Sequence, residues 1–173
     1  MGFFDGIENT RASFDASFIK HGVYWCKINR VKEDQNRAKV PFVAVEMTVV
    51  RVVQTEAGKQ AHRVGEEVSA LFMSNQDGYL ARFKRFIANV MGVEVDKITS
   101  GACDIVVSAK QPLAGSIVEV EGKGRVSKKT GKDVTGTVFS RTVPKPEVEA
   151  YIAQAKAAEI KAHDAMTAAQ TAK

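Results

Sequence analysis

A run of thirteen residues crowded with valine constrains the fold of this chain most strongly. The range 41–53 contains six valines, at positions 43, 45, 49, 50, 52 and 53. β-branched side chains favour strands, and thirteen residues exceed the usual length of a strand. Such length is typical of a strand that bends or coils round a barrel. The run therefore predicts a β-rich fold built around a long, curved strand.

Four other ranges have the alternating or β-rich pattern of strands: 22–32, 65–73, 116–126 and 133–143. The last two flank a glycine-containing loop over 127–132, which predicts a hairpin. Between the third and fourth strands, apolar residues recur at helical spacing, and the pattern predicts a helix capped by Asp77 and ended by Gly92. The range 96–110 fits either a short helix or a strand.

The order of these elements is three strands, a helix, two strands and a final helix. This order is that of a mainly β fold of the OB type, a five-stranded barrel with a helix between strands 3 and 4 and, here, an added C-terminal helix. A small β-sandwich could use the same strands.

The composition changes after Pro146. The segment 147–173 contains ten alanines, no glycine and no proline, and its net charge is −1. The preceding Pro144-Lys145-Pro146 disfavours a helix and predicts a stiff joint. We therefore expect an OB-type nucleic-acid-binding domain over 1–146 and an alanine-rich helix over 147–173. Val148, Tyr151 and Ile152 could dock that helix on the barrel or on a second copy of the chain, or the helix could be an inert extension.

Charge and composition narrow the class of protein. The net charge is +5 and the pI about 9.2, which favours polyanionic partners. The sequence contains no apolar run long enough for a membrane-spanning helix, and its first residues do not resemble a secretion leader. Two cysteines, Cys26 and Cys103, indicate reduced thiols. We expect a cytoplasmic protein that does not associate with membranes.

Motifs for catalysis or cofactor binding are absent from the sequence. The three histidines are scattered, and no metal-ligand spacing occurs. No phosphate-binding loop, nucleophile elbow or dinucleotide fingerprint is present. The expectation is therefore a protein that is not an enzyme, with no cofactor and no metal.

Side-chain alternation predicts a binding face. It places Trp25, Phe42 and Phe139 on the outer face of the strands, among Lys27, Lys123, Arg125 and Arg141. Rings interleaved with cations suit an unpaired nucleic-acid strand, because bases stack on the rings and cations neutralise phosphates. Alternatively, these rings pack under the C-terminal helix or in a dimer interface. Three glutamates on the same face, Glu46, Glu119 and Glu121, would repel phosphate.

The hairpin between the last two strands is the most basic segment. Its cations are Lys123, Arg125, Lys128, Lys129 and Lys132. In an OB-type barrel this loop flanks the binding cleft. A solvated hairpin whose lysines only prevent edge pairing would have the same composition.

Several segments together resemble the phage-encoded single-stranded-DNA-binding proteins of OB fold. They are the segment 20–28 (KHGVYWCKI), the long valine strand, the helix ending in Val90-Met91-Gly92, the Leu113-Ala114-Gly115 step and the basic hairpin. The resemblance covers roughly residues 18–143 and rests on the order of features.

The resemblance implies a function in DNA replication or recombination. Such a protein coats and protects single-stranded DNA without sequence preference, in the host cytoplasm if it is phage-encoded, and contacts replication or recombination proteins. The resemblance also implies stacking aromatics, here Trp25, Phe42 and Phe139. The chain departs from many such proteins because it ends in an alanine-rich helix and not in an acidic tail. An RNA-binding barrel, or a structural protein that assembles through its tail helix, would be consistent with the same sequence.

Overall fold

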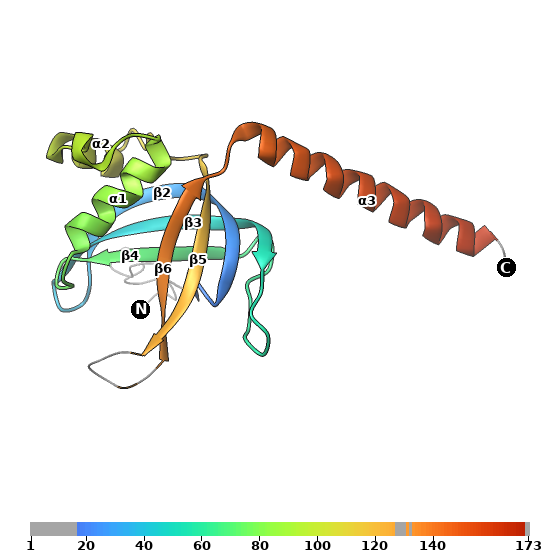
Figure 1. Cartoon of the computed structure of the whole chain (residues 1–173), viewed down its shortest axis with the longest axis horizontal. Helices are drawn as coiled ribbons and strands as arrows, with labels where there is room; N and C mark the ends of the chain where they lie inside the picture. Colours follow the sequence, from blue (N-terminus) through green and yellow to red (C-terminus); the bar gives the residue numbers. More distant parts are fainter. Residues whose placement is uncertain (1–16, 127–130, 132, 172–173) are drawn as a thin grey trace, which may run out of the picture. The chain divides into compact units, whose positions relative to one another are not determined.

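The computed structural model of the chain describes residues 17–126, 131 and 133–171 (Figure 1). The chain forms two compact units, Met1–Thr142 and Val143–Lys173. The first contains the whole sheet, and the second is a single helix.

The first unit is mainly β, as predicted. Its strands are β1 (Ser17–Phe18), β2 (Gly22–Gln35), β3 (Pro41–Gln54), β4 (Glu67–Met73), β5 (Ile117–Val126) and β6 (Asp133–Thr142). Their order in the sheet is β1-β4-β3-β2-β5-β6. Strands β2 to β6 form a five-stranded antiparallel sheet, and the short β1 pairs with β4 in parallel. Within the described residues β6 pairs with β5 alone, so the sheet is not closed into a barrel.

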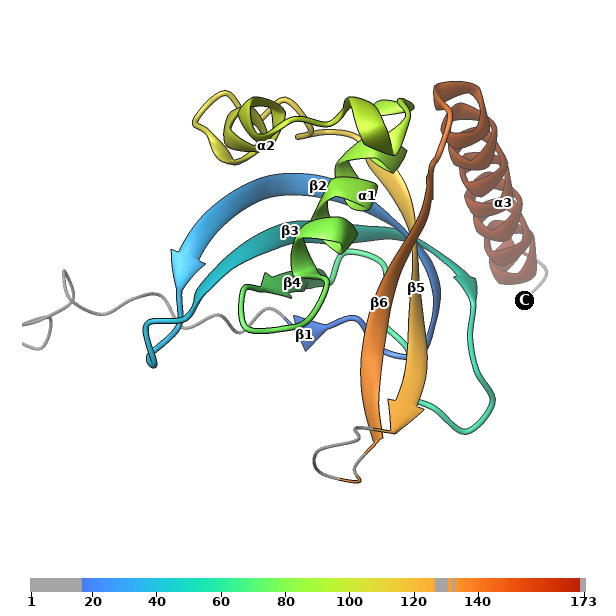
Figure 2. The ribbon, with the colours of Figure 1, turned by 60° about the vertical axis from the view of Figure 1, so that its left-hand side comes forward.

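The long, curved strand predicted over 41–53 is present as β3, and β2 is equally long. Strands β2 and β3 pair along their length with three register irregularities, at Val23/Tyr24, Trp25/Cys26 and Ile28/Arg30. Such irregularities increase local twist and bend a strand. Figure 2 shows the resulting curvature: β2 and β3 form an arch, and β5 and β6 run steeply across them.

The core lies on the concave side of this curved sheet. The predicted alternation of β2 is confirmed for Tyr24, Cys26 and Ile28, all of which are fully buried. Phe72 of β4 packs against Phe83 and Phe86 of the helix that follows, with ring centroids 5.2 and 5.7 Å apart. Burial of each such side chain contributes roughly 1.5–3 kcal/mol.

Three helical segments follow β4. Helix α1 (Tyr79–Met91) begins after Gly78, so the predicted cap at Asp77 is wrong by one position. Gly92 ends it as predicted, with a left-handed φ of 66° that glycine adopts without strain. The ambiguous range is helical, as η2 (Val95–Lys97) and α2 (Ser100–Val107), the latter capped by the hydroxyl of Thr99.

The second unit is helix α3 (Lys145–Thr171). It begins inside the segment predicted to be a stiff joint, with Pro146 in its first turn. A proline is tolerated there because the first helical N–H groups have no partner within the helix. Among the described residues, no helix combines the length and the apolar character needed to cross a membrane.

Candidate functional site

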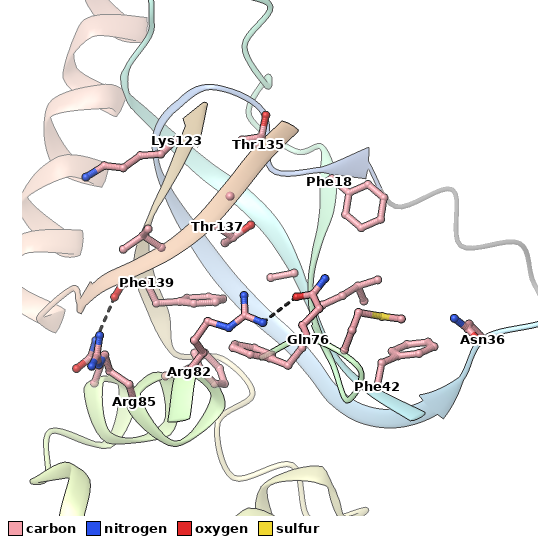
Figure 3. Close-up of a pocket in the computed structure, with 18 residues that line it drawn as sticks. Phe18, Asn36, Phe42, Gln76, Arg82, Arg85, Lys123, Thr135, Thr137 and Phe139 are labelled. Carbon is pink, nitrogen blue, oxygen red and sulfur yellow. Dashed lines mark hydrogen bonds between the residues drawn. The ribbon is translucent and has the colours of Figure 1, made fainter. Parts of the chain in front are cut away.

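A cleft of about 750 Å³ lies in the first unit where β4 and β6 are not paired. Strand β1 contributes Phe18, β4 contributes residues 70–73, β6 contributes residues 135–139, and helix α1 contributes Arg82, Arg85, Phe86 and Asn89. The remaining lining residues are Asn36, Phe42, Gln76 and Lys123 (Figure 3). The cleft exists because the curved sheet brings its two ends near each other without joining them.

Helix α1 is tied to β6 at one end of the cleft. The side-chain nitrogen of Asn89 donates a hydrogen bond to the carbonyl of Phe139 over 3.0 Å. The hydroxyl of Thr142 donates to the carbonyl of Asn89 over 2.9 Å. These reciprocal bonds hold the helix against the strand.

Aromatic rings form the floor of the cleft and part of its rim. The rings of Phe86 and Phe139 are 4.5 Å apart, and Phe72 stacks on Phe139 with centroids 6.1 Å apart and planes inclined by 17°. Phe42 is half-buried, whereas Phe18 is 65% exposed. An exposed ring beside a cleft offers a face on which a flat group can stack.

Positive side chains line the cleft as well. Arg82 and Arg85 extend from α1 and Lys123 from β5, and all three are exposed. Arg82 donates to the side-chain oxygen of Gln76 over 2.7 Å, and Lys123 lies 3.2 Å from a carboxylate oxygen of Glu121. None of the described residues that line the cleft is acidic.

The positive groups and the exposed rings are segregated. In Figure 3, Lys123 and Arg85 lie on one side of the cleft and Phe18 and Phe42 on the other, with Arg82 between them. The cleft therefore suits an elongated ligand that is anionic along one edge and has flat, apolar groups along the other.

Trp25, predicted to offer a stacking ring on the outer face of the strands, is covered there by other side chains. The side chain is 2% exposed, its indole N–H donates to Glu119 over 3.2 Å, and the guanidinium of Arg51 lies 4.4 Å from the ring centroid. Arg141 also donates to Glu119, over 3.2 Å. The register of β2 places Trp25 opposite both Arg51 and Glu119. Trp25 and Arg141 both bond to Glu119, and neither residue lines the cleft.

The predicted face of Phe139 is wrong. A bulge between Glu119 and Val120 shifts the pairing of β5 with β6, so that Arg141 pairs with Glu119 and Phe139 with Val120. A bulge interrupts the two-residue alternation. Phe139 therefore packs against the core, and Val138, predicted to be buried, is 43% exposed.

The other predicted residues divide into three groups. Phe42, Phe139 and Lys123 are brought together in the cleft. Lys27 is exposed on β2 outside the cleft lining. Lys128, Lys129 and Lys132 lie outside the described residues, and Arg125 is described only by its backbone, which pairs with Val134.

Sequence reasoning did not select Phe18, Arg82 or Arg85. Arg82 and Arg85 are three residues apart on α1, which places them on neighbouring positions of one helix face. This spacing in the sequence could have indicated a positive patch on the helix. For Phe18 no comparable signal exists, since a two-residue strand has no periodicity.

The described residues show neither a metal-binding cluster nor a reactive Cys26 thiol. Within the described part of the chain, no group of three His, Cys, Asp or Glu side chains is placed to hold a metal ion. Burial raises the pKa of the Cys26 thiol to about 12, so this thiol is a poor nucleophile at neutral pH.

No protein-family model matches the sequence, and a comparison with curated proteins also finds no match.

Proposed function

We propose that the first unit binds single-stranded DNA, without sequence preference, in the cleft between β4 and β6. One observation carries the proposal: the described lining combines positive side chains with aromatic rings and contains no carboxylate. A single nucleic-acid strand has this double character, with phosphates along one edge and unpaired bases along the other.

The segregation within the cleft suggests how the strand lies. Lys123, Arg82 and Arg85 would contact phosphates, and the aromatic side of the cleft would receive bases. Stacking contributes about 1–3 kcal/mol per base and does not depend on base identity. Phosphate contacts likewise carry no sequence information. Stacking and phosphate contacts therefore both favour binding without sequence preference.

Strand order supports an OB-type interpretation of the fold as part of this proposal. The five long strands follow one another along the chain in the predicted order, with α1 between the third and the fourth. In the sheet, β2 pairs with β3 and β5, β3 with β4, and β5 with β6. In this interpretation the protein is an OB-type barrel left open between β4 and β6, and the opening is the binding cleft.

Such binding would serve to protect unpaired DNA during replication or recombination. Membership of the phage-encoded family, and contacts with other replication proteins, remain predictions from the sequence resemblance.

Fluorescence anisotropy of labelled oligo-dT, oligo-U and duplex DNA, each at two salt concentrations, tests the proposal. Salt-sensitive binding that is tightest for oligo-dT supports it. Preference for oligo-U would favour the RNA-binding alternative, and no binding of any probe would favour a structural role.

A further inference from the structure

The short strand β1 lies at the edge of the sheet, next to β4. It pairs in parallel with β4, Ser17 opposite Val68 and Phe18 opposite Ser69, along the edge of β4 that β3 leaves free. This edge borders the cleft. Strand β1 therefore forms one wall of the cleft, and Phe18 lines it.

A buried histidine holds the end of this strand. The side chain of His62 is fully buried, with its Nδ1 2.6 Å from a carboxylate oxygen of Glu66 and its Nε2 3.0 Å from the backbone nitrogen of Lys20. A carboxylate only accepts, so the hydrogen-bond network assigns the proton to Nδ1 and leaves Nε2 to accept from Lys20. Nε2 also lies 3.1 Å from the carbonyl oxygen of Phe18, but both atoms are acceptors in this tautomer, so the hydrogen bond that holds the strand end is the one from Lys20. His62 thus contacts the backbone on both sides of Ile19.

The chain that follows β1 packs closely against two glycines of β5. A side chain at Gly122 would clash with the carbonyl of Lys20, and a Cβ at Gly124 would lie only 2.5 Å from the ring of His21. The absence of side chains at these two positions lets residues 20–21 pass close to β5. Together, His62 and β5 fix the segment that carries Phe18.

Most of the Phe18 ring is nevertheless in water. Its side chain is 65% exposed, although its backbone is paired with β4. A large apolar ring held rigidly at the rim of a cleft loses little conformational freedom when a flat group stacks on it.

We propose that Phe18 is a base-stacking residue of the cleft and that His62 is the positioning residue that holds it there. This inference rests on the proposed binding of single-stranded DNA. It adds a binding surface contributed by the N-terminal strand.

A Phe18→Trp variant of the full chain reports directly on stacking. Wild-type protein, whose only tryptophan is the buried Trp25, is the matched control. Anisotropy of labelled oligo-dT shows independently when each protein is saturated. We expect saturating oligo-dT to quench the emission of the F18W variant and to leave wild-type emission unchanged.

A double-mutant cycle tests the positioning by His62. Phe18→Ala should weaken oligo-dT binding roughly 5- to 150-fold, the effect of losing one stacked base. His62→Leu should weaken it similarly and add little to F18A, because both changes remove the same contact. Combined with Phe42→Ala, His62→Leu should weaken binding by its full single-variant factor, because His62 does not hold Phe42. His62→Gln, which keeps an acceptor and a donor, should restore part of the affinity.

The outcomes separate the two proposals. No anisotropy change with any protein would overturn the proposed function and this inference with it. If oligo-dT saturates the F18W variant without altering its emission, Phe18 does not stack on a base, and the inference alone is overturned. This measurement does not depend on whether His62→Leu folds. Full additivity of H62L with F18A would overturn the positioning role.

Discussion

The indole nitrogen of Trp25 and a carboxylate oxygen of Glu119 are hydrogen-bonded at 3.2 Å across the paired strands β2 and β5. The same oxygen of Glu119 accepts from Arg141, and Arg51 stacks on the indole. The ring that looked most suitable for stacking on DNA is therefore already engaged by side chains of its own protein.

The first prediction concerns this buried indole. In wild-type protein, saturating oligo-dT should leave the emission of Trp25 unchanged, because the ring is 2% exposed and lies outside the cleft lining. Steady-state fluorescence measures this. Strong quenching that follows the binding curve would place DNA on the outer face of β2 and contradict the assignment of the cleft.

A second prediction tests the aromatic floor of the cleft. Phe86 is 1% exposed and contacts the rings of Phe72, Phe83 and Phe139. Phe86→Ala should lower the free energy of unfolding by about 3–5 kcal/mol, because it leaves a cavity among these rings.

Chemical denaturation followed by circular dichroism measures the loss at Phe86. The control is Ile160→Ala on α3, where the side chain is 62% exposed and the change should stay within about 0.5 kcal/mol. Equal losses in both variants would show that Phe86 is not part of a packed floor.

The pH dependence of stability should reveal the bond between His62 and Glu66. Hydrogen bonding from His62 lowers the pKa of the Glu66 carboxyl below its ordinary value of 4.5. A carboxyl whose pKa is lower in the folded state stabilises the fold above the unfolded pKa, and this contribution disappears as the pH falls through the folded pKa.

Thermal unfolding from pH 7 down to pH 3 checks the contribution of Glu66. Wild-type protein should lose stability below about pH 4.5 more steeply than Glu66→Gln, which lacks the titrating group. Parallel curves for the two proteins would contradict the contact.

Thiol labelling provides a fourth prediction. Burial raises the pKa of both cysteines, and that of Cys26 reaches about 12. Cys26 is fully buried and Cys103 half-buried. At pH 8, a thiol-reactive dye should label Cys103 slowly in native protein and Cys26 only after unfolding. Mass spectrometry after digestion assigns the label, and early labelling of Cys26 would show that β2 is not buried as described.

The sequence predicted the local elements of this fold well, since they depend on short-range patterns. The alternation of Tyr24, Cys26 and Ile28 identified the core face of β2, and Gly92 marked the end of α1. The face of Phe139 was missed because a single bulge beside Glu119 reverses the alternation, and no residue pattern announced it.

Long-range relationships account for the remaining differences. The burial of Trp25 depends on its register with Arg51 and Glu119, which alternation within one strand does not report. The cleft depends on which strand edges stay unpaired. Its lining joins Phe18, Arg82 and Thr137, which are distant in the chain, and only the folded sheet brings them together.

The salt dependence of oligo-dT binding, measured after the cleft loses its positive charges, tests DNA binding in the cleft most directly. The variant Arg82→Gln/Arg85→Gln/Lys123→Gln removes three positive lining residues. The control, Lys59→Gln/Arg63→Gln/Lys110→Gln, removes the same charge from exposed positions outside the lining. Each phosphate contact on a single strand contributes about −0.7 to the slope of log K against log salt concentration. We predict that the cleft variant binds oligo-dT more weakly, with a slope shallower by about 2, while the control keeps the wild-type slope. Equal slopes for wild type, cleft variant and control would contradict binding of DNA in the cleft between β4 and β6.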